Sequence, residues 1–151
     1  MRTTRDPLSL DEQVCFAMVV ATRSVLSIYR PVLEPLGLTH PQYLVMLALW
    51  QGPPLSLKDL AGALRLDSAT LSPLLKRLEA AGLVARHRDS ADERSLAVEL
   101  TESGRALRER ALEVPGRVAA RLGLSESELV ALHTTLTHVI SATGGGPEVA
   151  R

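Results

Sequence analysis

Apolar residues recur at every third or fourth position through most of the chain, which is the spacing of one face of an α-helix. A capping box at residues 9–12 predicts the start of a long first helix that ends near Pro31. A second capping box at residues 39–42 predicts a helix that runs to about Gln51, where Gly-Pro-Pro at 52–54 stops it. The first third of the chain is therefore expected to be helical.

Residues 55–101 combine helical and strand-like patterns in a short space. Two short amphipathic helices come first, and Gly82 is a natural stop for the second. Two strands follow, Leu83–Arg88 and Ser95–Leu100, with turn-forming residues at 89–93 between them. This order predicts a winged helix-turn-helix, which places one helix in the DNA major groove and a β-loop on the adjacent backbone.

Two further helical segments follow this module. Thr101 caps a helix that Pro115 is expected to kink and Gly123 to end, and a capping box at Ser125 and Glu128 opens the last helix. The apolar stripes of the terminal helices lie outside the module and need a partner, and a second copy of the chain is the simplest one. A two-fold dimer would present two DNA-binding modules about one DNA turn apart.

The expected fold is mainly α with a small β-hairpin wing. The predicted units are an N-terminal dimerisation and sensor arm (1–36), a winged module (37–101), C-terminal dimerisation helices (102–142) and a flexible tail (143–151).

Composition limits the class of protein. The 151 residues suit one domain with dimerisation arms, and 46% of them are hydrophobic, enough for a core. Lys+Arg and Asp+Glu both number 17, so only a local basic patch could indicate nucleic-acid binding. No apolar run is expected to approach a membrane span, and the polar start lacks a signal-peptide core. Cys15 is the one cysteine, so we expect a reduced cytoplasmic protein without an intrachain disulfide, metal or other cofactor.

Predicted DNA contacts lie on the second short helix and on the wing. Small hydroxyl side chains suit base edges, cations suit phosphates, and Arg94 on the wing is placed to enter the minor groove with Asp92 holding it. The same residues also suit a solvated helix face and an ordinary exposed hairpin, and it is their occurrence together that favours DNA. The full set is Ser68, Thr70, Ser72, Pro73, Lys76, Arg77, Arg86, Arg88, Asp92 and Arg94.

Several motifs occur in a fixed order along the chain. They are LDEQVCFAM at 10–18, Tyr-Arg-Pro at 29–31, HPQYLVMLALW at 40–50, LDSATLSPLLKRLE at 66–79, LKRLEAAGLVAR at 75–86 and DERS at 92–95. Together they resemble the MarR family of transcriptional regulators, and within it the organic-hydroperoxide-sensing (OhrR) repressors. The resemblance covers nearly the whole chain and implies a homodimeric repressor that binds a pseudo-palindromic operator.

The resemblance also implies roles for three side chains. Cys15 matches the peroxide-sensing cysteine of these relatives, and Tyr29 matches one of two partner-subunit tyrosines that hydrogen-bond it. His40 stands where the second tyrosine commonly falls, so either the imidazole replaces the phenol or the network is looser here. Tyr43 is expected in the core. A resolving cysteine found in some relatives is missing.

A thiol reacts with a peroxide as the thiolate, so Cys15 would need groups that stabilise an anion. Hydrogen bonds from Tyr29 and His40 could do so, and a protonated His40 would act directly, whereas a neutral one could still donate one hydrogen bond. The first product would be a sulfenic acid. Without a second cysteine it would condense with a small cellular thiol, form a cyclic sulfenamide or over-oxidise.

Three functions remain open at this stage. The first is release of the repressor from DNA when an organic hydroperoxide oxidises Cys15. The second is release by a small aromatic ligand, with Cys15 as passive packing, since a lone cysteine on an apolar helix is usually a small buried hydrophobe. The third is a thiol peroxidase, against which the winged module argues, so we do not expect an enzyme.

Overall fold

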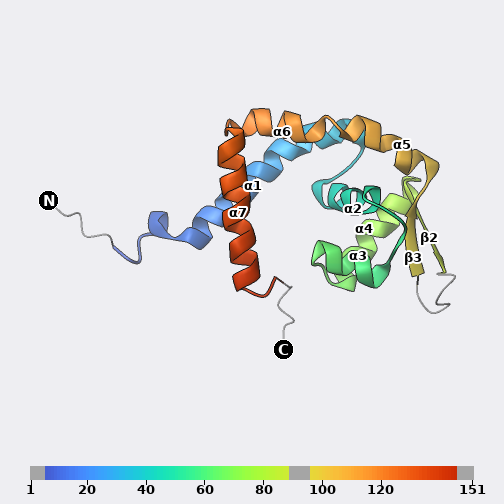
Figure 1. The fold of residues 1–151 in the computed structure, drawn as a ribbon, viewed down its shortest axis with the longest axis horizontal. Coiled ribbons are helices and arrows are strands. Elements are labelled where there is room, and N and C mark those ends of the chain that lie inside the picture. Colours follow the sequence, from blue (N-terminus) through green and yellow to red (C-terminus); the bar gives the residue numbers. More distant parts are fainter. Residues whose placement is uncertain (1–5, 89–95, 146–151) are drawn as a thin grey trace.

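The computed structural model describes residues 6–88 and 96–145, and Figure 1 shows their arrangement. Helices dominate the described part of the chain, and the strands form one small antiparallel sheet, so the mainly helical fold with a β-wing is confirmed. The elements in chain order are η1 (Leu10–Glu12), α1 (Val14–Leu33), η2 (Glu34–Leu36), α2 (His40–Trp50), β1 (Leu55–Ser56), α3 (Leu57–Leu64), α4 (Ser68–Ala80), β2 (Val84–Arg88), β3 (Leu96–Leu100), α5 (Glu102–Ala111), α6 (Val114–Leu122) and α7 (Glu126–Ala142).

Side-chain caps start the helices of the winged module. The predicted box at the start of α2 is present, with the Thr39 N–H donating to Gln42 Oε1 at 3.0 Å. Ser56 Oγ accepts from the Asp59 N–H at 3.0 Å at the start of α3. Asp67 Oδ1 accepts from the Thr70 N–H at 2.6 Å at the start of α4. These bonds satisfy amides that have no partner within their own helix.

The sheet has the strand order β1-β3-β2 and is antiparallel throughout. The sequence predicted only the hairpin of β2 and β3, so the prediction of a two-stranded wing missed β1. This strand has two residues, which pair with Val98 and Ala97 of β3. A two-residue strand is too short to show an alternating pattern. It nevertheless anchors the wing to the start of α3.

The hydrophobic core lies between the three helices of the winged module, the sheet and the end of α1. Its innermost side chains are at most 2% exposed and include Leu33, Met46, Leu49, Leu60, Leu71, Leu75, Leu78 and Val98. Val114 and Val118 belong to the same cluster and pack α6 against α1. The C-terminal part of α1 is therefore held by the winged module and by α6, which Figure 1 shows running side by side with it.

Two predicted helix boundaries are wrong. Ser9 and Glu12 form no capping box, because residues 10–12 make a 3-10 turn, and α1 begins only at Val14. The single kinked helix expected around Pro115 is two helices, since α5 ends at Ala111 and α6 begins at Val114. Pro115 lies in the first turn of α6, where its missing N–H costs little, so the proline starts a helix instead of bending one.

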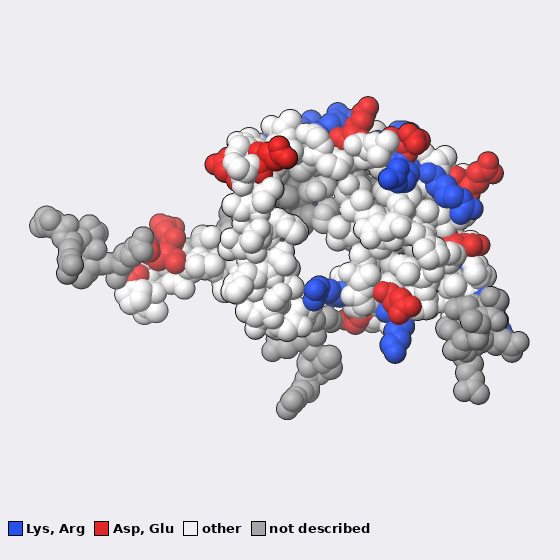
Figure 2. Space-filling view, viewed as in Figure 1, with Lys and Arg blue, Asp and Glu red and all other residues white. Residues whose placement is uncertain are grey.

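The N-terminal half of α1 and the whole of α7 leave apolar side chains uncovered. No residue of α7 is buried, and Figure 2 shows its visible face almost free of charged side chains. The uncovered side chains include Val14, Phe16, Val19, Val20, Leu26, Val130, Leu132, Leu136 and Ile140. A single chain thus leaves apolar side chains exposed along two of its helices, a feature that marks interaction surfaces when such side chains are contiguous.

One segment, Val14–Leu36, is long and apolar enough to cross a membrane by length and composition alone. The expectation that no apolar run approaches a membrane span is therefore wrong. Only 11% of this apolar window is buried within the chain, and Arg23 and Arg30 lie inside the segment. Uncovered apolar surface on a helix that also packs into a folded module is equally what a subunit interface requires.

Candidate redox centre and nucleic-acid interface

Cys15 lies in the first turn of α1 and is exposed. Its neighbours Val14 and Phe16 are 72% and 39% exposed, so the thiol sits within uncovered apolar surface. Because α1 begins at Val14 and not near Ser9, Cys15 lies closer to the helix N-terminus, and its unpaired amides, than the sequence suggested. The structure thus leaves the sulfur reachable.

Tyr29 and His40 come together in the structure. Their ring centroids are 4.7 Å apart with the ring planes at 64°, an edge-to-face contact. Tyr43, which is buried as expected, lies 6.0 Å from the Tyr29 ring and 6.4 Å from the His40 ring. These three rings form a cluster where the C-terminal half of α1 meets the N-terminus of α2. The contact of Tyr43 with the other two rings was not foreseen.

Burial sets the protonation of this aromatic cluster. It raises the pKa of Tyr29 and lowers the pKa of His40. At neutral pH the phenol therefore keeps its proton and the imidazole is uncharged, which leaves each ring with one hydrogen-bond donor. Of the two roles considered for His40, the structure favours the neutral donor over the cation.

The cysteine and the cluster are far apart within one chain. Cys15 and Tyr29 are on the same helix, and 14 residues of α-helix span about 21 Å. No side chain can close that distance. A contact between this thiol and these rings requires two chains.

An open pocket of ≈ 550 Å³ lies beside the cluster, with His40 in its wall. Leu26, Leu38 and Pro41 make much of this wall apolar, and Arg30 and Glu34 supply charge. The first residues of α2 and its Thr39 cap form part of the pocket wall. The pocket can accept an apolar group that carries a polar or anionic atom.

The six predicted DNA-contact residues between positions 68 and 77 all lie on α4, and five of them are exposed. Ser72 is half-buried, while the others are exposed, namely Ser68, Thr70, Pro73, Lys76 and Arg77. Pro73 lies inside the helix, beyond its first turn, so it leaves the Ala69 carbonyl without its usual donor. The helix still presents hydroxyl groups at its N-terminal end and cations further along.

The basic residues of β2 behave differently from one another. Arg88 is exposed at the end of the strand. Arg86 is not a free cation, because its Nε and Nη2 donate to the two carboxylate oxygens of Glu79 at 2.6 and 3.0 Å. Asp92 and Arg94 lie outside the described residues, so their predicted roles on the wing remain predictions.

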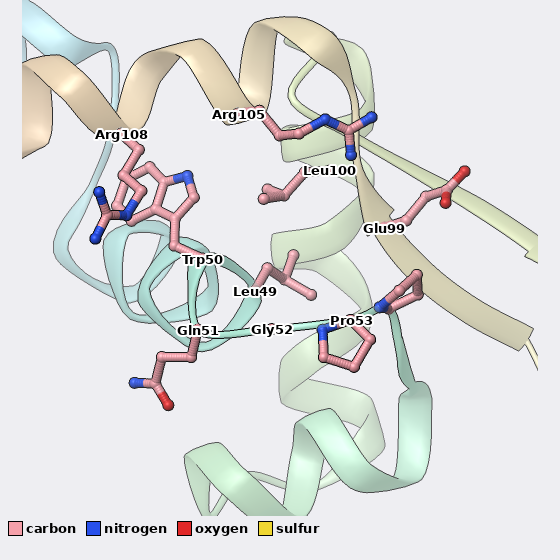
Figure 3. A pocket seen from close by; sticks show the side chains of 10 residues that line it. Leu49, Trp50, Gln51, Gly52, Pro53, Glu99, Leu100, Arg105 and Arg108 are labelled. Atoms are coloured by element: carbon pink, nitrogen blue, oxygen red, sulfur yellow. The ribbon is translucent and has the colours of Figure 1, made fainter.

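A second pocket, of ≈ 380 Å³, lies between the end of α2, the turn at 52–54, β3 and α5. Figure 3 shows Arg108 beside the Trp50 ring and Arg105 on the side of Glu99. The Trp50 Nε1–H donates to the Gly104 carbonyl at 2.9 Å, which leaves the ring face for packing. Within residues 6–88 and 96–145, neither arginine forms an ion pair. The sequence did not single out this pocket, because its walls come from segments about fifty residues apart.

The described residues contain no group of three His, Cys, Asp or Glu side chains that could hold a metal ion. The candidate functional groups of the described residues are the exposed Cys15 thiol, the aromatic cluster beside its pocket, the Trp50 pocket and the hydroxyl and basic face of α4.

A helix pair, a three-stranded sheet with a β-hairpin and hydroxyl and basic side chains on the outer face of the second helix define a winged-helix DNA-binding protein. The MarR family model matches residues 38–96. The chain is 42% identical over 126 residues to the organic hydroperoxide resistance transcriptional regulator of Bacillus subtilis (strain 168), covering 83% of this chain and 84% of that protein. The chain belongs to the MarR family of transcriptional regulators, as the motifs predicted.

Solved structures with the same fold include DNA complexes. Reduced AbfR bound to DNA is 37% identical, with a TM-score of 0.69 over 87% of this chain and 93% of that chain, and overoxidised AbfR is also seen bound to DNA. BpsR of Bordetella bronchiseptica, whose DNA binding is regulated by 6-hydroxynicotinic acid, is 31% identical, with a TM-score of 0.81 over 89% of this chain and 97% of that chain. Double-stranded DNA is therefore the partner that the family assigns to this chain.

Proposed function

We propose that this protein is a cytoplasmic, homodimeric repressor that leaves its operator when an organic hydroperoxide oxidises Cys15. The observation that carries the proposal is the separation of the thiol from its aromatic cluster. Cys15 is exposed in uncovered apolar surface, and Tyr29 lies about 21 Å further along the same helix, where it contacts His40 beside an open pocket. A second chain that covers this surface can bring its own sulfur to the cluster.

The dimer itself is supported by the uncovered helices. The N-terminal half of α1 and the stripe of Leu132, Leu136 and Ile140 on α7 are apolar and exposed in one chain. Burying such surface is favourable by about 25 cal/mol per Å², and homodimer interfaces resemble cores in composition. A two-fold arrangement then presents two copies of α4 to one duplex.

The proposed reaction starts from the Cys15 thiolate. Its sulfur attacks the terminal oxygen of ROOH, so that an S–O bond forms as the O–O bond breaks, and the alkoxide leaves and takes up a proton to become the alcohol. The sulfur is thereby oxidised to a sulfenic acid and the peroxide is reduced. A small cellular thiol then attacks this sulfur, forms the mixed disulfide and releases water.

The mixed disulfide is the product that we expect to release DNA. It adds a bulky group at a packed interface, and packed interfaces switch between discrete arrangements instead of deforming smoothly. A switch would change the spacing of the two winged modules and prevent both from engaging the operator. A relative in an overoxidised state is seen bound to DNA, which favours added bulk over added oxygen as the releasing change.

Cys15→Ser is the direct test. The side chain is exposed, so the variant should bind operator DNA within about twofold of the wild type. Organic hydroperoxide followed by a small thiol should release the wild type and leave the variant bound in a gel-shift assay. Intact-mass measurement on the same samples should show the adduct only on the wild type. Release of the variant at the dose that releases the wild type would contradict the proposal.

A second candidate function is favoured by the Trp50 pocket. An aromatic ring face beside Arg105 and Arg108, which form no ion pair with another described residue, suits a planar organic acid. The pocket also lies where α2 meets α5, so an occupant would bear on the junction between the winged module and the dimerisation helices. Release of Cys15→Ser from DNA by 6-hydroxynicotinic acid, with loss of that release in Arg105→Gln/Arg108→Gln, would identify this function.

The number of hydroperoxide molecules that each chain consumes distinguishes a regulator from an enzyme. A regulator should consume about one equivalent of hydroperoxide per chain and stop, whereas a thiol peroxidase would continue with a small thiol as reductant. We propose the first outcome. Sustained consumption by the wild type that Cys15→Ser lacks would assign an enzyme instead.

A further inference from the structure

The ion pair between Glu79 and Arg86 connects the two elements that must meet DNA together. Glu79 lies in the last turn of α4, the helix that carries the predicted base contacts, and Arg86 lies in the middle of β2, the first strand of the wing. Arg86 Nε and Nη2 donate to Glu79 Oε1 and Oε2 at 2.6 and 3.0 Å, so both groups engage through two parallel bonds. The side chains are 22% and 30% exposed, so solvent and salt screen this pair less than a free surface pair.

Two parallel bonds fix an angle as well as a distance, which a single charge contact does not. The Arg86 hydrogen bond is also the main reason that the pKa of Glu79 is lowered, so the carboxylate stays ionised at neutral pH. The backbone already joins α4 to β2 through a short turn, in which the Gly82 N–H donates to the Glu79 carbonyl and the Leu83 N–H to the Leu78 carbonyl. The Glu79–Arg86 pair therefore connects α4 to β2 a second time, in addition to the backbone turn.

Exposed cations flank the corner between α4 and β2, on both elements. Lys76 and Arg77 are exposed on α4, and Arg88 is exposed at the end of β2. If these groups hold the phosphate backbone through their flexible side chains, a small change in the angle between α4 and β2 misaligns the base contacts of α4 while the phosphate contacts remain. Two of the N–H groups of the Arg86 guanidinium, on Nε and Nη2, are used by Glu79.

We propose that Glu79 and Arg86 are positioning residues, which fix the angle between the recognition helix and the wing and do not themselves contact phosphate. The proposal rests on DNA binding by the family and is independent of how the protein is released from DNA.

Glu79→Gln distinguishes a positioning role from a phosphate contact, because the two roles predict opposite changes in DNA affinity. If Arg86 bound phosphate, removing the carboxylate would free the guanidinium and reduce local negative charge, so DNA affinity would rise. If the pair positions the wing, affinity should fall by about tenfold, the size of one lost base contact. The assay is fluorescence anisotropy with duplex DNA from the upstream intergenic region, under reducing conditions so that oxidation plays no part.

Salt dependence gives the second readout. Arg86→Gln should weaken binding while the slope of log affinity against log salt stays at the wild-type value, because no phosphate contact is lost. Arg77→Gln is the matched control, since this exposed arginine on the same helix should lower the magnitude of the slope by about one. Glu79→Asp keeps the charge but shortens the side chain, and it should weaken binding as Glu79→Gln does.

Two further measurements exclude a folding defect. Circular dichroism and urea unfolding should show each variant folded at the assay temperature, and the double variant Glu79→Gln/Arg86→Gln should bind no more weakly than either single variant, as expected for residues that act as a unit. Affinity of Glu79→Gln equal to or above that of the wild type, or a reduced salt slope for Arg86→Gln, would overturn the proposal.

Discussion

Burial acts in opposite directions on the two titratable rings beside the proposed thiol site. It raises the pKa of the Tyr29 phenol and lowers the pKa of the His40 imidazole. Both shifts favour the uncharged ring, since burial penalises the charged form of any group. At neutral pH the site therefore offers two neutral donors, and replacement of a phenol by an imidazole at position 40 preserves the number of donors while changing its response to acid.

His40 should make the protein lose stability on acidification. In the unfolded chain the imidazole binds a proton as the pH falls through 6.5, whereas the folded chain, whose His40 pKa is lowered, binds it only at a lower pH. The unfolded state therefore binds more protons in that window, and stability falls with pH. The midpoint of urea unfolding should drop more between about pH 7.5 and about pH 5.5 in the wild type than in His40→Gln.

The other three histidines are present in both the wild type and His40→Gln, so their contributions to the pH dependence of stability cancel in the comparison. Protein concentration must be held constant, because an oligomer gains stability by mass action. Equal losses in the wild type and in His40→Gln would show that the half-buried imidazole of His40 does not cause the loss of stability in acid.

Single residues also show where sequence-based prediction was strong and where it failed. The cap at Thr39 was predicted correctly because its partner lies three residues away. Arg86 was expected to be a free cation because Glu79, seven residues earlier and across a turn, has no local pattern that links the two. The proximity of Tyr29 and His40 entered only through the family resemblance. Contacts between neighbours in the chain can be derived from the sequence, and contacts made by folding cannot.

At the scale of elements, Gly104 lies where the winged module meets α5, the first of the helices proposed for dimerisation. It lies in the first turn of α5, its N–H donates to the Thr101 cap, and its carbonyl accepts from Trp50 Nε1. A Cβ at this position would meet the Leu83 carbonyl oxygen, which belongs to the backbone and cannot give way. The absence of a side chain here allows α5 to approach the start of the wing.

Gly104→Ala should destabilise the protein by about 1–3 kcal/mol, the cost of forcing an extra carbon into a packed region. Gly62→Ala is the matched control, because Gly62 is inside α3 with open space around its Cβ position, and it should stabilise by about 0.5–1 kcal/mol. Urea unfolding of both variants measures the difference. A neutral Gly104→Ala would mean that α5 can shift away from the wing without cost.

The elements that the sequence failed to predict share a physical cause. β1 exists only because two residues meet β3 in the folded chain, and two residues carry no period. The break between α5 and α6 depends on the packing of Val114 and Val118 against α1, which turns Pro115 from a kink into a helix start. The helix-turn-helix and the hairpin were predicted because their periods, caps and turn residues are local.

For the whole molecule, the uncovered face of α7 is the surface on which the proposed dimer depends. Leu132, Leu136 and Ile140 are 47%, 38% and 41% exposed and four residues apart, so they form one apolar stripe. Each is already in contact with solvent in the single chain. A polar substitution there should leave the winged module folded and act only on association.

Leu136→Glu should raise the dissociation constant of the dimer by about 100-fold or more, because the carboxylate would lose its hydration in an apolar interface. Operator affinity should fall with it, since a single winged module makes half of the contacts. Sedimentation measures the first effect and anisotropy the second. Thr134→Glu is the control, because residues two apart on a helix point about 200° from each other. Dimerisation of Leu136→Glu at wild-type strength would exclude this face from the interface.

The distance between Cys15 and Tyr29 along α1 has one more consequence in the proposed dimer. Each chain contributes its Cys15 sulfur to one site and its Tyr29 phenol and His40 imidazole to the other, so each site contains residues of both chains. A substitution at residue 29 or 40 would leave the thiol of its own chain untouched and alter the chemistry of its neighbour's. In a cell that makes two versions of this protein, the response of a mixed pair would follow from which version contributes each half.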